Sequence, residues 1–228
     1  MHNTLVVFKK QLCDTLKNKI ILAQFILLPV MTLIFENAIT IDGMAENYFV
    51  KLFSGMYIGM APLMATASII SEEKEKNTLR VLMMGNIKPW QYLIGIGSYV
   101  WTICMMGALF MSINFPAKDR PFYLVMMALG MIISILTGAC IGVFSKNQMK
   151  ATSIVMPAMM ILAFIPMIAM FNDTVKKFSK VLYTAQLQNL FNEMSFSALK
   201  GSAAIVLGVN ALICVLLFVL AYKRKGLE

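Results

Sequence analysis

Long apolar runs alternate with short charged or turn-forming segments along the 228 residues of this chain. A helix of about 20 apolar residues is long enough to cross the hydrocarbon core of a bilayer. Six segments reach or approach that length, at about 20–41, 52–71, 92–115, 122–145, 151–171 and 201–222. The pattern predicts an all-α polytopic membrane protein with six transmembrane helices, in one domain over residues 1–228.

The first residues predict a different kind of helix. Over residues 3–19, apolar side chains recur at spacings of three and four, and lysines occupy much of the remaining surface. The apolar stripe consists of Leu5, Phe8, Leu12, Leu16 and Ile20. A basic amphipathic helix of this kind lies in the membrane interface with its lysines toward the headgroups. An ordinary solvated helix is the alternative.

Residues 172–200, between the fifth and sixth spans, also break the rhythm. They are too polar to span a membrane and too apolar to form a loose loop. One apolar face is formed by Val175, Phe178 and Leu182, and a second by Leu187, Leu190, Phe191 and Met194. We therefore expect two short amphipathic helices that lie at the interface or dip into it as a re-entrant segment.

The segment between the second and third spans is charged in its first half and apolar in its second. Charged groups at the bilayer centre are costly, so this segment must lie outside the hydrocarbon. We expect a single helix over 72–90. The positive end of its dipole would favour the early acids Glu72, Glu73 and Glu75. Its apolar face, Leu79, Leu82 and Met83, would then suit a groove on a partner protein.

The distribution of basic residues predicts the orientation. Six spans place both ends of the chain on the same side of the membrane. That side also holds 72–90 and carries more Lys and Arg residues than the opposite side. The positive-inside rule therefore places both termini in the cytoplasm. Lys176, Lys177 and Lys180 weigh against this, but they lie in the longest outer loop.

Composition supports a membrane protein and excludes several other classes. Hydrophobic residues make up 59% of the chain, charged residues only 14%, and the mean hydropathy is +0.76. The net charge of +9 is better explained by basic loops beside anionic headgroups than by nucleic-acid binding. With one histidine and four scattered cysteines, the sequence offers no metal or catalytic constellation.

Two glycine pairs mark expected packing faces inside the spans. Gly55 with Gly59, and Gly138 with Gly142, have the G-x-x-x-G spacing that lets helices approach closely. The spacing is also common by chance, so it indicates packing and little more.

Three other residues inside the spans have more than one interpretation. Pro157 and Pro166 in the fifth span free backbone carbonyls, which is typical of a bent or pore-lining helix and equally of a plain packing kink. Glu36 is an acidic residue near the end of the first span. It is either a functional group or a side chain that snorkels to water.

Residues 73–82 read E-K-E-K-N-T-L-R-V-L. Placed directly after the second span, they resemble the E-[KR]-E-[KR]-G-T-L-E-x-L signature of type-2 ABC exporter permeases. Asn77 stands where glycine is usual, and Arg80 stands where an acid is usual. Asparagine is the next-best residue for a left-handed backbone, so Asn77 can keep the local geometry. The resemblance extends over the whole chain, from the amphipathic first helix to the helical segment before the last span.

The resemblance implies a membrane subunit whose cytoplasmic coupling helix docks into a separate ATPase. It implies that the docking residues are Glu72, Glu73, Glu75, Thr78, Leu79, Arg80, Leu82 and Met83. The chain has no G-x-x-x-x-G-K-[ST] loop, so ATP and Mg would be bound by the partner and the chain would be no enzyme. Two ATPase copies and a second, identical or homologous permease would complete a transporter in a bacterial cell membrane, in contact with its lipids.

The cargo is the least defined expectation. The 21 methionines indicate an adaptable path for hydrophobic or amphipathic molecules, although codon bias explains them equally well. Small members of the resembling family export peptides such as bacteriocins and cytolytic peptides, or drugs, or confer immunity to such peptides. A lipid-exporting ABC permease, an ion-coupled secondary transporter, and a membrane enzyme or scaffold are the alternatives. The secondary class usually shows internal repeats and intramembrane charges, and here only Glu36 is a candidate.

Overall fold

The computed structural model describes the whole chain except residues 1, 18, 40–42, 44, 86, 196–198, 200 and 226–228. All regular structure in the described residues is helical, as the sequence predicts. The elements are α1 His2–Lys17, α2 Lys19–Ala38, α3 Tyr48–Glu75, α4 Thr78–Met84, α5 Pro89–Met111, η1 Ser112–Asn114, α6 Arg120–Phe144, α7 Gln148–Met159, the π-helical η2 Met160–Phe164, α8 Ile165–Ala169, α9 Asp173–Ser179, α10 Tyr183–Glu193 and α11 Ser202–Lys225.

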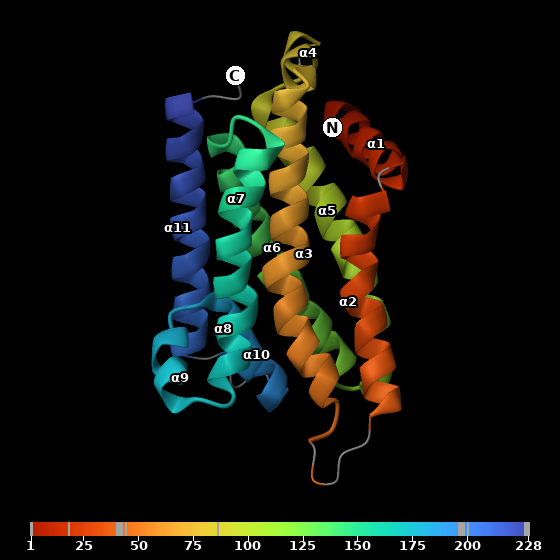
Figure 1. The fold of residues 1–228 in the computed structure, drawn as a ribbon, viewed down its shortest axis with the longest axis vertical. Coiled ribbons are helices and arrows are strands. Elements are labelled where there is room, and N and C mark those ends of the chain that lie inside the picture. The colour runs from red at the N-terminus through yellow and green to blue at the C-terminus, as the bar shows by residue number, and fades with distance from the viewer. Residues whose placement is uncertain are drawn as a thin grey trace.

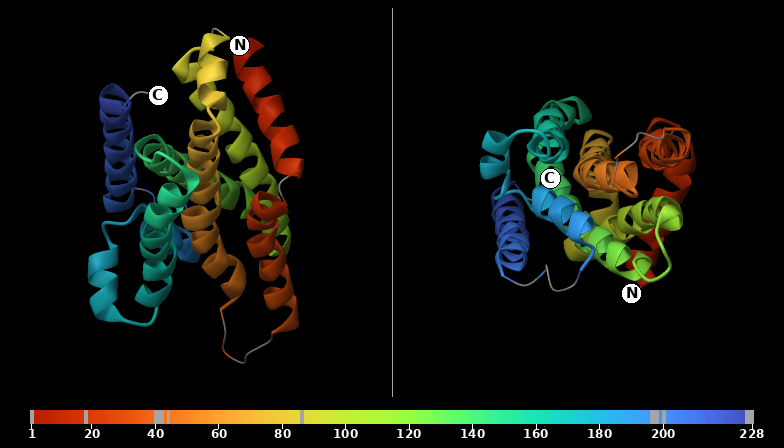
Figure 2. Two further views of the ribbon diagram at one scale, coloured as in Figure 1. Left: turned by 45° about the horizontal axis from the view of Figure 1, so that its top comes forward. Right: turned by 90° about the horizontal axis from the view of Figure 1, so that it is seen from below.

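The long helices form a bundle with α3 at its centre (Figure 1). α3 packs against α2, α5, α6, α7 and α10, and most of its side chains are buried. α11 stands at the edge, where it packs against α6 and α10. α4, the start of α1 and the end of α11 lie at one end of the bundle, and α9 and α10 lie at the other (Figures 1 and 2). These are called the α4 end and the α9 end below.

The predicted spans correspond to helices of the bundle. Five described helices are long and apolar enough to cross a membrane: α3, α5 with η1, α6, the continuous α7–η2–α8 segment, and α11. α2 contributes a shorter apolar helix over Leu22–Ala38. The chain is therefore an all-α polytopic membrane protein. α3 extends beyond the predicted 52–71 at both ends, and residues 40 and 41 of the first predicted span lie outside the described part.

Local sequence signals set several helix boundaries. The side chain of Asn147 accepts a hydrogen bond from the Lys150 amide at the start of α7, and Asn172 caps α9 in the same way. Pro89 and Pro121 lie in the first turns of α5 and α6, where a missing N–H costs nothing. Glu36 in α2 accepts a hydrogen bond from the Val50 amide, 3.1 Å away, in the first turn of α3. This acid therefore caps a helix in the structure.

α1 packs along α5 through a face that the periodicity selected only in part, since Phe8 of the predicted stripe packs edge-on against Tyr99 of α5. Val7, Gln11 and Thr15 are buried, whereas Leu5 and Leu12 of the predicted stripe are exposed. Val7 packs on Gly95, because a carbon added at that glycine would lie 2.8 Å from the Val7 side chain. α1 thus has an inner face held by α5 and an outer face carrying Leu5 and Leu12.

The glycine pairs lie where backbones approach most closely. A Cβ at Gly138 of α6 would lie 2.4 Å from the carbonyl oxygen of Leu63 in α3, and one at Gly142 would lie 2.8 Å from Ile70. On α3, a Cβ at Gly59 would lie 3.0 Å from the Leu162 carbonyl, and one at Gly55 would overlap a side-chain atom of Gln188. The α3–α6 contact therefore depends on the absence of side chains at Gly138 and Gly142, and the contact of α3 with η2 on their absence at Gly59.

Alanine at Gly138 is expected to lower the stability of the chain, whereas alanine at Gly208 is expected to leave it unchanged or raise it. Helix propensity favours alanine over glycine by about 1 kcal/mol. At Gly208 of α11 nothing lies within 4 Å of the added carbon, so that gain is retained. At Gly138 the added carbon overlaps a backbone carbonyl, and α3 and α6 must separate. Thermal unfolding midpoints in detergent test this, and a Gly138→Ala midpoint at or above that of Gly208→Ala would contradict it.

The two prolines of the fifth span flank a π-helical turn. Pro166 has no N–H to donate to the Leu162 carbonyl, so the regular hydrogen-bond ladder fails there. The chain forms the π-helix Met160–Phe164 in this region. The Leu162 carbonyl instead lies close to Gly59 of α3. The irregular turn is thus a packing contact between α3 and the fifth span.

The outer segment forms two short helices, but only α9 remains at the surface. α10 is inserted between α3, α6, α8 and α11, and Leu187, Leu190 and Phe191 are almost fully buried. The Tyr183 hydroxyl lies 2.6 Å from the Ser134 hydroxyl of α6, which in turn donates to the Ile58 carbonyl of α3. The second helix is therefore packed into the bundle, where polar groups that would be costly alone are paired.

Candidate functional site

The charged segment after the second span is divided between two helices. α3 continues through Glu75, the chain turns at Lys76 and Asn77, and α4 begins at Thr78. Glu72, Glu73 and Glu75 therefore lie in the last turn of α3, and the predicted single helix over 72–90 is not formed. The expected stabilisation of these acids by the N-terminus of their own helix is wrong, because they lie at its C-terminus, which carries the negative end of the dipole.

Asn77 gives the turn its geometry. Its φ of 55° is left-handed, which confirms the conformation expected from its place in the motif. The Asn77 amide donates to the Lys74 carbonyl, and the Thr78 hydroxyl donates to the Glu73 carbonyl at 3.2 Å. These bonds end α3 and set the direction of α4.

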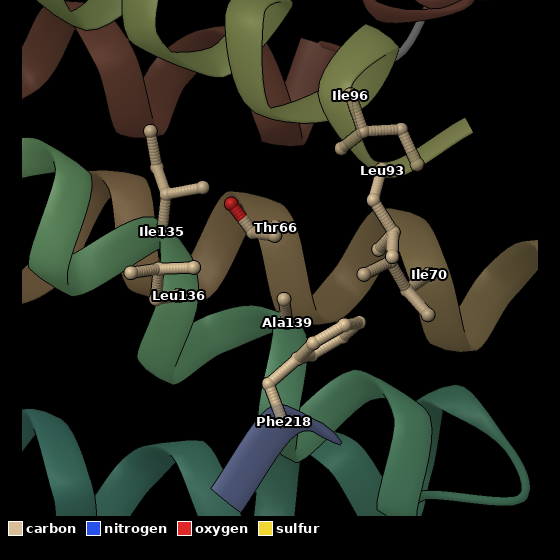
Figure 3. A pocket seen from close by; sticks show the side chains of 8 residues that line it. All are labelled: Thr66, Ile70, Leu93, Ile96, Ile135, Leu136, Ala139 and Phe218. Atoms are coloured by element: carbon tan, nitrogen blue, oxygen red, sulfur yellow. The ribbon is translucent and has the colours of Figure 1, made fainter. Parts of the chain in front are cut away.

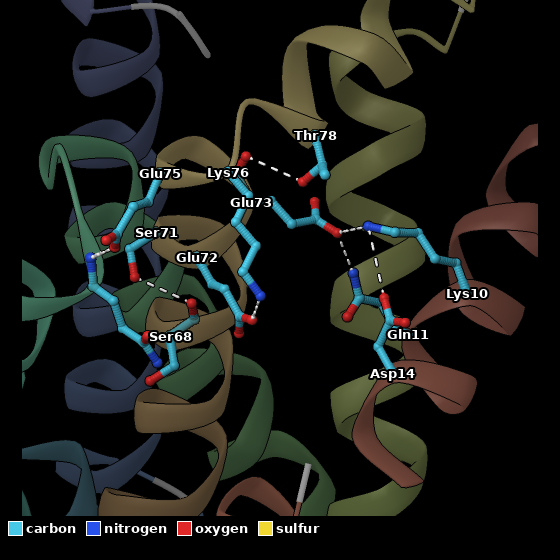
Figure 4. Close-up of polar contacts among 11 residues, drawn as sticks. Lys10, Gln11, Asp14, Ser68, Ser71, Glu72, Glu73, Glu75, Lys76 and Thr78 are labelled. Carbon is cyan, nitrogen blue, oxygen red and sulfur yellow. Dashed lines mark hydrogen bonds and ion pairs between the residues drawn. The ribbon is translucent and has the colours of Figure 1, made fainter. Parts of the chain in front are cut away.

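Glu73 is held inside the protein by α1. Glu73 is only 5% exposed. Its Oε1 accepts hydrogen bonds from Lys10 Nζ and from Gln11 Nε2, the latter at 2.5 Å (Figure 4). Lys10 also lies 3.9 Å from Asp14. The buried carboxylate is thus balanced by a lysine and an amide from a helix more than 60 residues earlier in the chain.

The next two charges of the motif bind the ends of other helices. Lys74 Nζ donates to the Val143 carbonyl at the C-terminus of α6, 2.8 Å away. Glu75 Oε2 accepts from the Gln148 amide at the N-terminus of α7, also at 2.8 Å. A cation at a helix C-terminus and an anion at a helix N-terminus are each the favourable combination. The end of α3 is therefore joined to α1, α6 and α7.

The ion pair between Glu72 and Lys76 joins two residues of the motif that are one helical turn apart. Lys76 Nζ lies 2.5 Å from Glu72 Oε1, one turn earlier in α3, and the carboxylate raises the pKa of the exposed Lys76 ammonium above its ordinary value. Residues 72–76, with Lys10, Gln11, Val143 and Gln148 as partners, are called the charged junction below.

One face of α4 packs against the rest of the protein, and the opposite face is exposed to solvent. Leu79 is 1% exposed, and Leu82 packs partly buried against the same core. The opposite face carries Arg80, Val81 at 61% exposure and Met84 at 73%. These three residues are called the tip face below. The predicted apolar docking face therefore points inward at Leu79 and Leu82, and the side chain of Met83 lies outside the described part.

The predicted docking residues are thus separated by the structure. Glu73 and Leu79 are buried, and Glu72, Thr78 and Leu82 are half-buried. Of the predicted residues whose side chains are described, only Glu75 and Arg80 are exposed. The sequence did not indicate that Val81 and Met84 would form the exposed side of α4. Apolar residues occupy both sides of the helix T-L-R-V-L-M-M, so its periodicity selects neither side. A weak signal was present, since Leu79 and Leu82 share the spacing of three expected of one buried face.

One cavity in the middle of the bundle is too small for cargo. It measures 70 Å³ and lies between α3, α5, α6 and α11 (Figure 3). Apart from the Thr66 hydroxyl its lining is apolar: Thr66, Ile70, Leu93, Ile96, Ile135, Leu136, Ala139 and Phe218. A water molecule in the liquid occupies about 30 Å³, so this space is a packing void, far smaller than a peptide.

Comparison with known proteins identifies one family. A family model described as ABC-2 family transporter protein matches residues 4–223. No match was found among curated proteins. The matched range begins within α1 and ends within α11, so it includes the charged junction and the tip face.

Proposed function

The chain belongs to the ABC-2 family of transporter proteins and is the membrane subunit of an ABC transporter, and we propose that it exports a hydrophobic or amphipathic cargo. The energy would come from ATP hydrolysis by a separate ATPase subunit. The cargo class that best fits the methionine-rich, weakly charged spans is a peptide or a drug. The charged residues of these spans lie at their ends, which supports a pump driven from outside the membrane over an ion relay.

We propose that the ATPase docks on the tip face. The observation that carries this is the position of α4, which caps the bundle at the end where α1 begins and α11 ends (Figure 1). Its Leu79 side is bound to the core while Val81, Met84 and Arg80 remain uncovered. Large apolar side chains beside a charge, on a helix outside the hydrocarbon, suit a groove on a soluble partner. The excess of basic residues at this end supports a cytoplasmic location for it and for both termini.

The charged junction would pass movement of the ATPase from α4 to the membrane helices. Movement of α4 is passed directly to α3, because only the two-residue turn at Lys76 and Asn77 separates them. Glu73, Lys74 and Glu75 then transmit it to α1, α6 and α7 through short polar contacts. Interfaces of this kind move as units because packed helices do not deform continuously.

A complete transporter would contain a second permease and two ATPase subunits. The central void of 70 Å³ offers no room for a peptide, so a path is better formed between two permease chains than within one. The second chain would be either another copy of this protein or a homologous partner.

Reconstitution with a candidate ABC ATPase subunit from the same organism tests the proposal. Proteoliposomes containing both subunits should accumulate a fluorescent amphipathic peptide only when ATP is added on the side of the ATPase. The purified chain alone should hydrolyse no ATP. Transport that persists without nucleotide and collapses when an ion gradient is dissipated would contradict the proposal and favour a secondary transporter. Movement of labelled lipid but of no peptide or drug would place the chain among the lipid exporters.

A further inference from the structure

Residues from α8, α9, α10 and the turns beside them line a polar pocket. These helices lie at the α9 end of the bundle (Figure 1). The volume of the pocket is 220 Å³. The polar side chains that line it are Lys176, Ser179, Lys180, Gln188, Asn189 and Asn192, and no aspartate or glutamate lines it. Asp173 and Glu193 lie on the same two helices but not on the pocket wall. The lining is therefore rich in hydrogen-bond donors and carries uncompensated positive charge.

The floor of the pocket contains a buried amide whose donor is poorly used. Gln188 is 3% exposed, and within the described part of the chain its Nε2 donates only to the Met170 sulfur, at 3.9 Å. A thioether is a weak acceptor, so this buried N–H group favours a stronger acceptor beside it. Lys176, Lys180, Asn189 and Asn192 are exposed around it. An oxyanion in the pocket would be bound by several charge-assisted hydrogen bonds.

The surroundings of the pocket indicate where the oxyanion comes from. Phe171, Phe178 and Val181 are exposed on the same short segment of chain that carries the two lysines of the pocket. α9 directly follows α8, the end of a membrane-crossing segment, so it lies at the depth of the lipid headgroups. Exposed aromatic residues beside lysines are typical of the membrane–water interface. These exposed apolar side chains and the expected headgroup depth favour a membrane lipid over a soluble anion as the source of the oxyanion.

We propose that this pocket binds the phosphate of an anionic phospholipid, whose acyl chains extend into the adjoining bilayer. Lys176 of α9, Lys180 directly after α9 and the amides of α10 hold the phosphate together, so the lipid bridges the two helices. The turn between these helices is already ordered, because Gln186 Nε2 donates to the Lys180 carbonyl at 2.6 Å and Asn210 of α11 donates to the Val181 carbonyl. The proposal requires only a membrane location, so its failure would leave the transport proposal intact.

Lipid titration of the purified chain in an uncharged detergent tests the site. Phosphatidylglycerol should raise the thermal unfolding midpoint, whereas a glycolipid with the same acyl chains and an uncharged headgroup should not. Lys176→Gln/Lys180→Gln should weaken phosphatidylglycerol binding about tenfold or more. Lys177→Gln is the matched control for Lys176→Gln alone, which should also weaken binding, because each removes one positive charge from α9 and only Lys176 lines the pocket. Asn192→Leu, a second variant that keeps all lysines, should weaken binding about threefold.

Three outcomes would overturn the inference. The first is a loss of binding in Lys177→Gln equal to that in Lys176→Gln, which would show a diffuse charge effect. The second is displacement of the lipid by inorganic phosphate at matching concentrations, which would show a site for the free anion. The third is displacement by an acidic peptide at lower concentrations than phosphatidylglycerol, which would assign the pocket to a peptide. All substituted residues are exposed, so the variants should unfold at the wild-type midpoint when no lipid is added.

Discussion

Glu73→Ala is expected to lower the stability of the chain by about 2 kcal/mol, with a fall of about 5 °C in the thermal unfolding midpoint. The substitution removes the buried acceptor of Lys10 and Gln11. Loss of one partner of a fully buried pair costs more, but the Lys10 side chain is 30% exposed and recovers part of its hydration. The unpaired amide of Gln11, which is 3% exposed, adds to the loss.

The same substitution should uncouple α1 from α3. Since Glu73 joins these helices, the ATPase should still assemble with the variant, but cargo movement per ATP hydrolysed should fall. Glu72→Ala is the matched control, because it removes an exposed pair with Lys76 that is worth about 0.5 kcal/mol or less. A double-mutant cycle with Lys10→Ala isolates the pair. Equal midpoints for the Glu73 and Glu72 variants would show that the α1–α3 contact contributes nothing to stability.

Val81→Asp/Met84→Asp is expected to abolish assembly with the ATPase while the chain remains folded. Both side chains are largely exposed, so neither acid is buried in the chain itself. A charge placed in an apolar interface leaves an unpaired buried ion, and central interface residues commonly contribute about 2 kcal/mol, roughly thirtyfold in affinity. Pull-down or surface binding with the purified ATPase measures the effect, and the unfolding midpoint reports on folding.

Met149→Asp is the control for this variant. Met149, in the first turn of α7, is 80% exposed but does not belong to α4. Its substitution should leave ATPase binding unchanged. Leu79→Asp should instead destabilise the chain, because Leu79 is 1% exposed. Wild-type ATPase binding by Val81→Asp/Met84→Asp would exclude the tip face as the docking surface.

Much of the architecture could be predicted from the sequence. The apolar runs predicted an all-helical membrane protein, Asn77 was expected in a left-handed conformation, and two short helices were expected before the last span. Each of these depends on a local cause: the thickness of the bilayer, the preference of one residue for one backbone region, or the spacing of apolar residues along one helix.

The candidate site was predicted less completely. The resemblance selected residues 72–90 as the docking segment, but it gave the docking role to residues that include Glu73 and Leu79, which are buried. The three acids were placed at a helix start, whereas they end α3. Glu73 and Glu75 are bound by Lys10, Gln11 and Gln148, far away in the chain, and no local pattern shows those partners.

The sequence by itself determined what kind of protein this is and which segment extends beyond the membrane. Spans must be apolar and long wherever their neighbours lie, because lipid offers no hydrogen bonds to the backbone. Only the tertiary structure decided which side of α4 is free, how deeply α10 is inserted, and that the motif charges join four helices. Both sides of α4 are apolar, and burial in α10 depends on Ser134 and Ile58 of other helices. These features arise from contacts between distant residues, which periodicity along a single helix does not contain.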